Sequence, residues 1–352
     1  MGLRNTVKGR ATVVALWAAR VCGCQDCGVT AAGGRLLRYR ADAPAATIVF
    51  GTAVWMVVGA AGLIPLWSIV FLPLALRWVG VIQHNHTHVP LFRQSTCNRM
   101  VDVALTFVSA VPQSLYRHLH VDVHHRFVNT PKDWTGPFYR AGTSFPERPV
   151  PFSQYCLTTT ARCWRRGMPT VWRRERAALV VCCLPAAVVL IGLMIASPAG
   201  AAVFLLAPWV ATAVFLPATN WRQHSGCTYQ SPSTSANVNF GVLHGVLAFN
   251  IGYHSAHHIR PAAHWTKLPE LHARFIAASL PTACRRHGIF AEAAGSVRAA
   301  SDRLLVRDRR DRATDGGEQR EHRCVDVDPL PTHTLEKERG DLLLAPAHHL
   351  RG

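Results

Sequence analysis

The chain has 352 residues, of which 49% are hydrophobic and only 16% are charged, and its formal net charge is +18. A soluble domain of this length usually carries about a quarter charged residues, so the composition argues against a soluble protein and indicates apolar surface facing lipid. The arginines flank apolar stretches and form no patch interleaved with stacking aromatic residues, which argues against nucleic acid as a partner.

Residues 1–43 are predicted to form a basic N-terminal tail. Residues 11–19 (ATVVALWAA) resemble the core of a signal peptide, but they are short and no convincing cleavage site follows them. The CGCQDCG segment at 22–28 could offer thiolates to a metal, yet no second Cys or His pair lies near it, so we expect no site there. Eleven cysteines, an odd number, do not indicate a disulfide framework.

Two apolar hairpins follow the tail. Residues 46–64 and 66–82 carry one charged residue, Arg77, and are each long enough to cross most or all of a ~30 Å hydrocarbon core, with Pro65 as the turn. Residues 177–196 and 201–219 repeat the pattern around the turn 197–200. The sequence therefore predicts an all-α integral membrane protein with two transmembrane helical hairpins, that is, four spans.

The distribution of charge predicts the orientation of these spans. Neither hairpin turn is charged, whereas the stretch between the hairpins is rich in basic residues: Arg117, Arg126, Lys132, Arg140, Arg148, Arg162, Arg165, Arg166, Arg173, Arg174 and Arg176. By the positive-inside rule this stretch and both termini are cytoplasmic, in what we expect to be the cell inner membrane. Residues 44–289 would then form one membrane domain with a cytoplasmic helical cap.

Two shorter apolar segments lie within the cap. Residues 101–116 and 238–252 are too short or too interrupted to span, so we expect interfacial or re-entrant helices, with buried helices of the cap as a nearly equal alternative. Residues 290–352 are polar and are predicted to form a disordered tail.

Histidines occur in three clusters: HNHTH at 84–88, HLHVDVHH at 118–125 and HSAHH at 254–258. Each cluster contains an i, i+4 pair, which on a helix lies on one face and can grip one ion or two adjacent ions. The predicted ligands are His84, His88, His120, His124, His125, His224, His254, His257 and His258. Nine imidazoles exceed the needs of one zinc ion and indicate two metal ions. The clusters contain almost no carboxylate and the chain has no Glu-x-x-His motif, which argues against a carboxylate-bridged di-iron site.

The order HxxxH, HxxxHH, a single histidine after the fourth span and HxxHH, around two apolar hairpins, resembles the membrane fatty acid desaturase family over about residues 46–275. HHRFVNTPKDW at 124–134 and NIGYHSAHHIRPAAHWTKLPELH at 250–272 add to the similarity. The resemblance implies two iron ions held by the nine histidines and a fatty acyl desaturase that uses dioxygen and two electrons. By resemblance alone, Asn220 reaches a metal through water.

Residues near the predicted ligands are expected to have roles other than metal binding. Single histidines (His86, His118, His244 and His264) are expected to pack or to support ligands without binding metal, and His86 could face solvent. Asp122, Asp133 and Trp134 could either orient a ligand imidazole or lie at the surface. Tyr253 and Trp265 could line a substrate path, although an interfacial position is expected first.

Other functions remain open at this stage. A fatty acid or alkane hydroxylase could use the same scaffold, although HNHTH differs from the Glu-containing boxes associated with alkane oxidation. A metal transporter would need polar ligands near the bilayer midplane, and a bis-His haem protein would need facing histidines within the spans. No cytochrome b5-like His-Pro-Gly-Gly occurs, so a separate ferredoxin or cytochrome-type electron donor is expected, attracted by the basic face.

Overall fold

The computed structural model describes residues 36–140, 149–227, 231–240, 245 and 247–286. All of them belong to one unit, Met1–Ser296, and the second unit, Val297–Gly352, lies outside the described residues. The segments 11–19 and 22–28 and the predicted C-terminal tail also lie outside them. The domain boundaries at 43 and 289 therefore stay predictions.

The first predicted hairpin is confirmed. A 3₁₀ turn, η1 (Arg40–Asp42), leads into α2 (Ala43–Ala60), and η2 (Leu66–Phe71) leads into α3 (Leu72–His88). The turn between them uses Gly62 at φ +76°, a conformation that glycine adopts without steric cost. α3 continues past the predicted end of the span at residue 82, and it carries the first histidine cluster on its last turns.

The second hairpin is longer than predicted. It consists of α6 (Phe152–Ala196), α7 (Pro198–Ala201), the π-helical η4 (Ala202–Leu206) and α8 (Ala207–His224). α6 begins 25 residues before the predicted span, and its two halves meet at a kink at Glu175 (φ −135°, ψ 32°). The predicted turn 197–200 is wrong, because only Ser197 leaves the helical conformation and a proline starts the next helix, where its missing N–H costs nothing.

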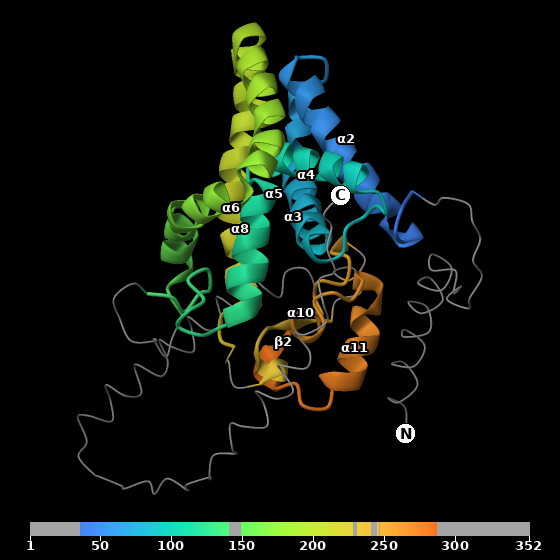
Figure 1. Ribbon diagram of the computed structural model, residues 1–352, viewed down its shortest axis with the longest axis vertical. Helices are drawn as coiled ribbons and strands as arrows, with labels where there is room; N and C mark the ends of the chain where they lie inside the picture. Colours follow the sequence, from blue (N-terminus) through green and yellow to red (C-terminus); the bar gives the residue numbers. More distant parts are fainter. Residues whose placement is uncertain (1–35, 141–148, 228–230, 241–244, 246, 287–352) are drawn as a thin grey trace, which may run out of the picture. The chain divides into compact units, whose positions relative to one another are not determined.

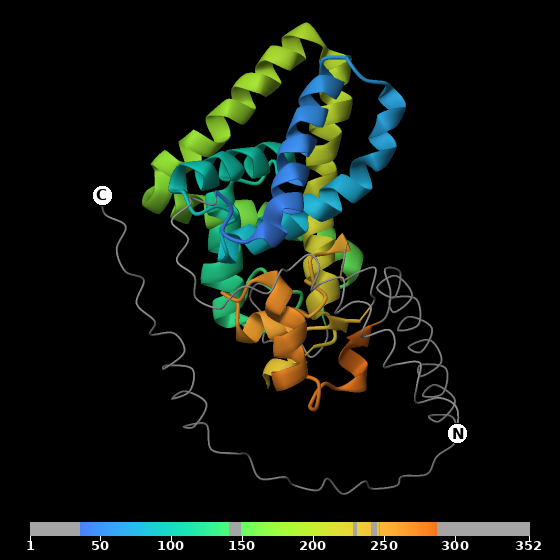
Figure 2. The same ribbon diagram turned by 90° about the vertical axis from the view of Figure 1, so that its right-hand side faces the viewer.

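The four long helices are each apolar enough to cross a membrane: Arg40–Ala60, Leu66–His88, Phe152–Ala196 and Pro198–His224. Large apolar side chains on the second half of α6 are exposed, including Leu184 at 58% and Ile195 at 80%, as expected for surface that faces acyl chains. The chain is an integral membrane protein. Both hairpin turns lie at one end of the bundle, and α3 and α8 finish at the other end in His88 and His224 (Figures 1 and 2).

The segment between the hairpins packs on the spans. α4 (Ser95–Ser109) contacts α2 and α6 and buries Val101, Leu105 and Val108 in the main apolar core. The chain then reverses at Ala110 (φ 55°) and continues as α5 (Gln113–Arg117) and the π-helical η3 (His118–His125). The single helix predicted over 101–116 is therefore wrong: Pro112 disfavours helical geometry at Val111 and starts a new helix. α4 matches the alternative of a buried helix.

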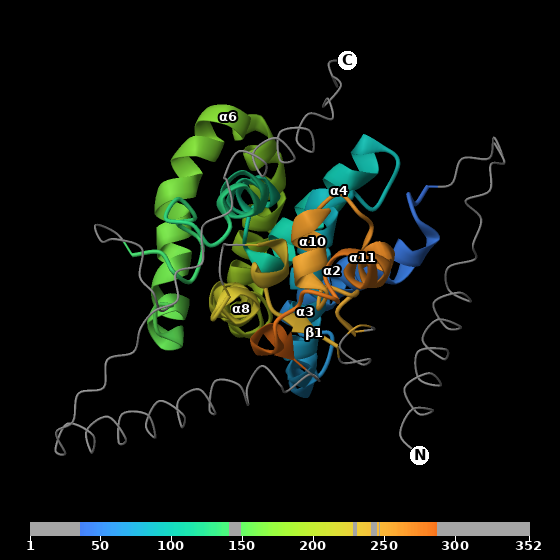
Figure 3. The same cartoon turned by 90° about the horizontal axis from the view of Figure 1, so that it is seen from below.

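The C-terminal part of the described chain consists of short elements. They are η5 (Pro232–Thr234), β1 (Val238–Asn239), α10 (His254–Ile259), η6 (Trp265–Lys267), α11 (Leu268–Phe275), η7 (Thr282–Cys284) and β2 (Arg285–Arg286). β1 pairs in parallel with β2, with Asn239 opposite Arg286. The single helix predicted over 238–252 is only partly confirmed: Gly245 and Leu247 are helical, but the segment starts as β1, and Phe249 and Asn250 have positive φ. Figure 3 shows α10 near the centre, beside α11.

Two glycines, Gly59 and Gly200, allow the two hairpins to pack closely against each other. A Cβ at Gly200 would collide with the backbone carbonyl oxygen of Ala60, and one at Gly59 would collide with the ring of Phe204. Backbone cannot yield as a flexible side chain can. Glycine at 200 therefore sets the close approach of the second hairpin to α2.

We expect Gly200→Ala to destabilise the protein by about 1–3 kcal/mol, because overpacking forces the hairpins apart. The thermal midpoint of the detergent-solubilised protein would report the loss. Gly192→Ala on α6 is the matched control, because nothing lies within 4 Å of its Cβ position and alanine favours the helix. Equal midpoints for the two variants would contradict this account of the contact.

Candidate metal centre

The three histidine clusters and His224 converge at one end of the bundle. The structure brings eight imidazoles into two groups of four, and within each group the possible ligand atoms all lie within 4.8 Å of one another. The first group is His84, His88, His120 and His257, and the second is His124, His224, His254 and His258. Each group takes its members from three separate elements, so the groups exist only in the folded chain.

The first group is centred on α3. The Nε2 atoms of His84 and His257 lie 2.9 Å apart, although the residues are 173 positions apart in the chain. His88 lies one helical turn after His84, and its ring is 4.9 Å from that of His120. The predicted pairing of His84 with His88 on one helical face is therefore confirmed.

The second cluster is divided between the two groups, because it forms a π-helix. An α-helix would place His120 and His124 on one face, but in a π-helix the i, i+5 residues face each other more closely. Accordingly the Nε2 atoms of His120 and His125 lie 3.1 Å apart, whereas His124 turns toward His224, with a distance of 3.0 Å between their Nε2 atoms. A π-helix of this kind is frequent at functional sites.

In two rings of the second group, His124 and His224, a hydrogen bond on Nδ1 fixes the orientation of the nitrogen on the other side of the ring. His124 Nδ1 lies 3.0 Å from the Asp133 carboxylate, and His224 Nδ1 lies 2.9 Å from the carbonyl oxygen of Ser235. Because Nδ1 donates to these oxygens, the Nε2 lone pairs remain free to point at one another and at a metal. Asp133, one of three residues of ambiguous role in the sequence, is thus the carboxylate that orients a histidine.

His125 lies between the two groups. Its Nε2 is 3.1 Å from that of His120 and 3.0 Å from that of His257, and its ring centroid is 4.5 Å from that of His258. It therefore fits best as a further donor to the first group, next to the second.

Burial keeps these imidazoles neutral. Loss of water lowers the pKa of His120, His125, His254, His257 and His258 well below 6.5, and neighbouring imidazoles lower it further. Burial alone would raise the pKa of Asp133, but the charge of His124 and hydrogen bonds from His124 and Thr135 bring it below its usual value. A neutral imidazole is the form that binds metal.

The donor set fits two metal ions. The Nε2 atoms of His88 and His258 are buried and have no hydrogen-bond partner within the described protein, one in each group. A buried polar atom without a partner is costly, and a metal ion would satisfy it. All-imidazole donors suit iron, zinc, copper or nickel, so geometry alone supports two metals without selecting iron.

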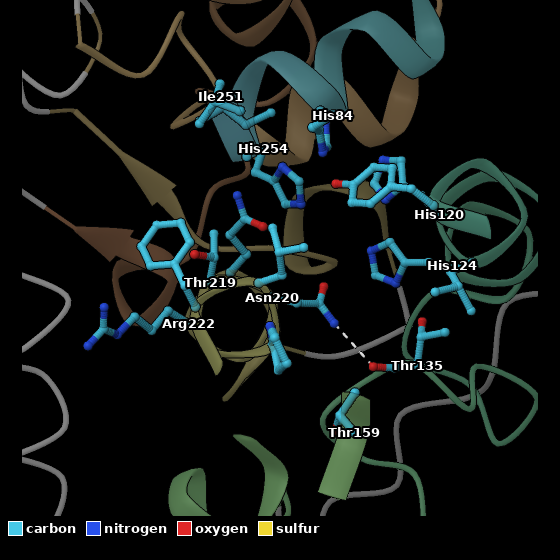
Figure 4. A pocket seen from close by; sticks show the side chains of 18 of the residues that line it. His84, His120, His124, Thr135, Thr159, Thr219, Asn220, Arg222, Ile251 and His254 are labelled. Atoms are coloured by element: carbon cyan, nitrogen blue, oxygen red, sulfur yellow. Dashed lines mark hydrogen bonds between the residues drawn. The ribbon is translucent and has the colours of Figure 1, made fainter. Parts of the chain in front are cut away.

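Asn220 lies on the cavity wall near His124 (Figure 4). Its Nδ2 donates to the carbonyl oxygen of Thr135 at 3.2 Å and to the Tyr155 hydroxyl at 2.8 Å. Tyr155 is buried and its hydroxyl donates to the same carbonyl oxygen. The sequence did not single out Thr135 or Tyr155. Thr135 lies in the segment that carries Asp133, but only the fold brings Tyr155 to it.

The remaining single histidines have carboxylate partners. His86 is not solvent-facing, because it is buried and its Nε2 lies 3.1 Å from Asp102. His264 packs in the interior as expected, with its Nε2 3.0 Å from the buried Asp42. His244 lies outside the described residues.

The other residues of ambiguous role contact partners that are not predicted ligands. Asp122 is 51% exposed and pairs with His118 at 3.0 Å, so it has the surface role. Trp134 packs against the guanidinium of Arg166. Trp265 donates to Asp42, and Tyr253 packs on Phe240. Neither Trp265 nor Tyr253 lines the cavity described next.

A cavity of about 170 Å³ opens beside both groups. Its wall includes His84 and His120 of the first group and His124 and His254 of the second. Apolar side chains make much of the remainder. They come from α3, the turn before α5, α5, η3, α8 and the segment before α10: Val81, Val111, Leu115, Leu119, Phe215, Leu216, Pro217 and Ile251. Figure 4 shows the imidazoles along one side of this space.

Fold and site together define a class: an integral membrane protein whose helices carry two adjacent groups of histidines able to hold metal, next to a cavity with apolar walls. The family model for fatty acid desaturases matches residues 55–290, more than half of the chain. No curated protein matches the chain. The chain belongs to the fatty acid desaturase family, and its function is that of a metal-dependent oxidoreductase of the desaturase or hydroxylase type acting on a lipid substrate.

We expect Asp133→Asn to weaken metal binding about 10–100-fold, because the neutral amide holds the His124 ring less firmly. Metal per chain, measured by mass spectrometry after dialysis against a graded series of chelator concentrations, would show the change. Asp122→Asn is the control, because that exposed carboxylate contacts His118 and no predicted ligand. Metal retention equal to that of the unmodified protein would exclude the orienting role of Asp133.

The metal-free protein should lose stability as the pH falls. The unfolded chain takes up protons on these histidines near pH 6.5, whereas the folded chain does so only at lower pH, since burial lowers their pKa. Stability is therefore complete above about pH 6.5, and each such group removes up to about 1.4 kcal/mol per pH unit below it. Thermal midpoints of chelator-treated protein between about pH 7.5 and 5.5 would test this. A constant or rising midpoint on acidification would contradict it.

Proposed function

We propose that the protein is a membrane fatty acyl desaturase that introduces a double bond into an acyl chain, using two iron ions, dioxygen and two electrons. The observation that carries this proposal is the position of the cavity. Histidines of both groups form part of the wall of a space whose other walls are largely apolar, which suits an acyl methylene chain. A metal store or a structural metal site would not need such a space beside both groups.

The nine histidines named above are the proposed ligands. His84, His88, His120, His125 and His257 would hold one ion, and His124, His224, His254 and His258 would hold the other. When bound, two irons with dioxygen would supply the oxidising power to remove hydrogen from two neighbouring methylene carbons. Asn220, held by Thr135 and Tyr155, is placed to hold a water beside the second group.

The protein's own contribution is positioning. Helices α3 and α8 and the π-helix hold the imidazoles rigidly, because each continues from an element packed in the bundle. The apolar wall would orient one carbon–carbon bond of the chain and keep bulk water away from the reacting atoms. Asp133 and the carbonyl of Ser235 fix the tautomers of His124 and His224, so that these two rings are already oriented toward the rest of the second group.

The orientation follows from the same arrangement. Both hairpin turns lie away from the histidines, and the basic residues of the first half of α6 lie at the histidine end. By the positive-inside rule, we place the histidines in the cytoplasm, where a separate ferredoxin or cytochrome-type donor would supply electrons. Arg165, Arg166, Arg173 and Arg174 form a basic surface that an acidic donor could approach.

Expression in a host that makes only saturated lipids, followed by mass spectrometry of its acyl chains, tests the proposal. A desaturase would yield chains lacking two hydrogen atoms, and a hydroxylase would yield chains with one added oxygen. His258→Ala should abolish the product, because it removes a donor of the second group, whereas His118→Ala should retain it. Formation of the hydroxylated product alone would overturn the proposal in favour of the hydroxylase. Absence of any modified lipid with an added donor system would overturn both.

A further inference from the structure

The charged side chains in the cavity wall are all basic. Three arginines line it, Arg77, Arg222 and Arg286, and no Asp or Glu occurs among its described lining residues. Arg222 lies near the end of α8, and its Nε is buried without a hydrogen-bond partner in the described structure. A cation in contact with a cavity of low polarity is unfavourable unless an anion meets it. The guanidinium of Arg286 donates to the carbonyl oxygens of Ala283 and Arg285, whereas an anionic ligand would give the Nε of Arg222 a partner that the described protein does not provide.

Arg222 and Arg286 belong to one local arrangement. Asn237, just before β1, donates through Nδ2 to the carbonyl oxygen of Arg222 at 2.7 Å. Two residues later Asn239 lies opposite Arg286 in the β1–β2 ladder. The strand β1 therefore lies beside both arginines, and Asn237 and Asn239 line the cavity with them. Arg77 is separate, because it lies on α3 about two turns from His84 toward the hairpin turn.

We propose that Arg222 and Arg286 bind the anionic headgroup of the acyl substrate, a carboxylate or a phosphate, while its chain extends along the apolar wall past the histidines. This inference rests on the proposed acyl substrate and adds the chemistry by which that substrate is held. Planar guanidinium groups recognise both anions through paired hydrogen bonds. Carboxylate and phosphate share this chemistry, so the structure selects an anionic acyl compound over a neutral one.

Arg222 also has a structural contact that the test must separate from ligand binding. Its guanidinium lies 5.5 Å from the ring centre of Phe152 at the start of α6. Loss of this contact would lower stability and weaken every ligand equally. Loss of an anion site would weaken the binding of charged ligands alone. The ratio of the affinity for an anionic ligand to that for a neutral ligand therefore distinguishes ligand binding from the structural role.

Binding to purified full-length protein in neutral detergent is the test, with no turnover required. Palmitate, palmitoyl-CoA and dipalmitoyl phosphatidate are the anionic probes, and hexadecanol is the neutral one. We expect Arg222→Gln and Arg286→Gln each to lower the affinity for the tightest-binding anionic probe by about tenfold or more, and to leave the affinity for hexadecanol unchanged. Arg222→Lys should keep part of this affinity, because lysine retains the positive charge but cannot form the paired hydrogen bonds of a guanidinium.

Arg285→Gln is the matched control. Arg285 precedes Arg286 in β2, is exposed, and donates to the carbonyl oxygen of Leu280, whereas only Arg286 lines the cavity. Side chains alternate in a strand, so this change removes the same charge on the other face. The anionic probe that binds most tightly shows whether the headgroup is that of a free acid, a CoA ester or a phospholipid.

Three results would overturn the inference: equal weakening of hexadecanol, no weakening of any anionic probe, or an effect confined to Arg77→Gln. Thermal midpoints of all variants confirm that they fold. Because binding is measured without catalysis, these results do not depend on the lipid profile of the expression host. If the protein proves to be a desaturase but both variants still bind anionic probes as tightly as before, the headgroup site is refuted and the proposed function is not.

Discussion

The burial of many imidazoles in one small volume is the constraint on which the rest of this structure depends. Eight rings from four helical elements bring their nitrogens within 4.8 Å in two groups, and a ninth lies between the groups. Protonation of many of these rings together would be unfavourable, because protonated imidazoles would repel one another without water to screen them. Such a cluster favours neutral histidines and requires fixed tautomers and a scaffold that tolerates the cost.

The scaffold meets these requirements by extending membrane helices into the site. α3 and α8 continue from lipid-facing segments into the histidines, so the packing of the spans also positions the donors. The π-helix at His118–His125 then turns one cluster toward both groups. Asp133 and the carbonyl of Ser235 hold the second group from behind. Membership of the fatty acid desaturase family agrees with this plan, in which the bundle is rigid and the chemistry lies at its end.

The cavity lies beside both histidine groups. Its apolar wall suits an acyl chain, and its arginines are the proposed binding site for an anionic headgroup. Substrate charge and chain would thus be recognised at different parts of one space. Positioning by the headgroup fixes how far the chain extends past the histidines, and this distance is what would select the bond that reacts.

Much of the fold follows from the sequence alone. The two hairpins are visible because a span is a local property, a run of apolar residues long enough for the bilayer, and the nine histidines are visible because their spacing and order are local as well. Only the tertiary structure decided how they group: His120 and His124 fall into different groups through a π-helix, and Asp133, not Asp122, supports a ligand. It also broke one predicted helix at Ala110 and made the start of the other a strand. The grouping depends on contacts between residues distant in the chain, such as His84 with His257, which no local pattern of residues encodes.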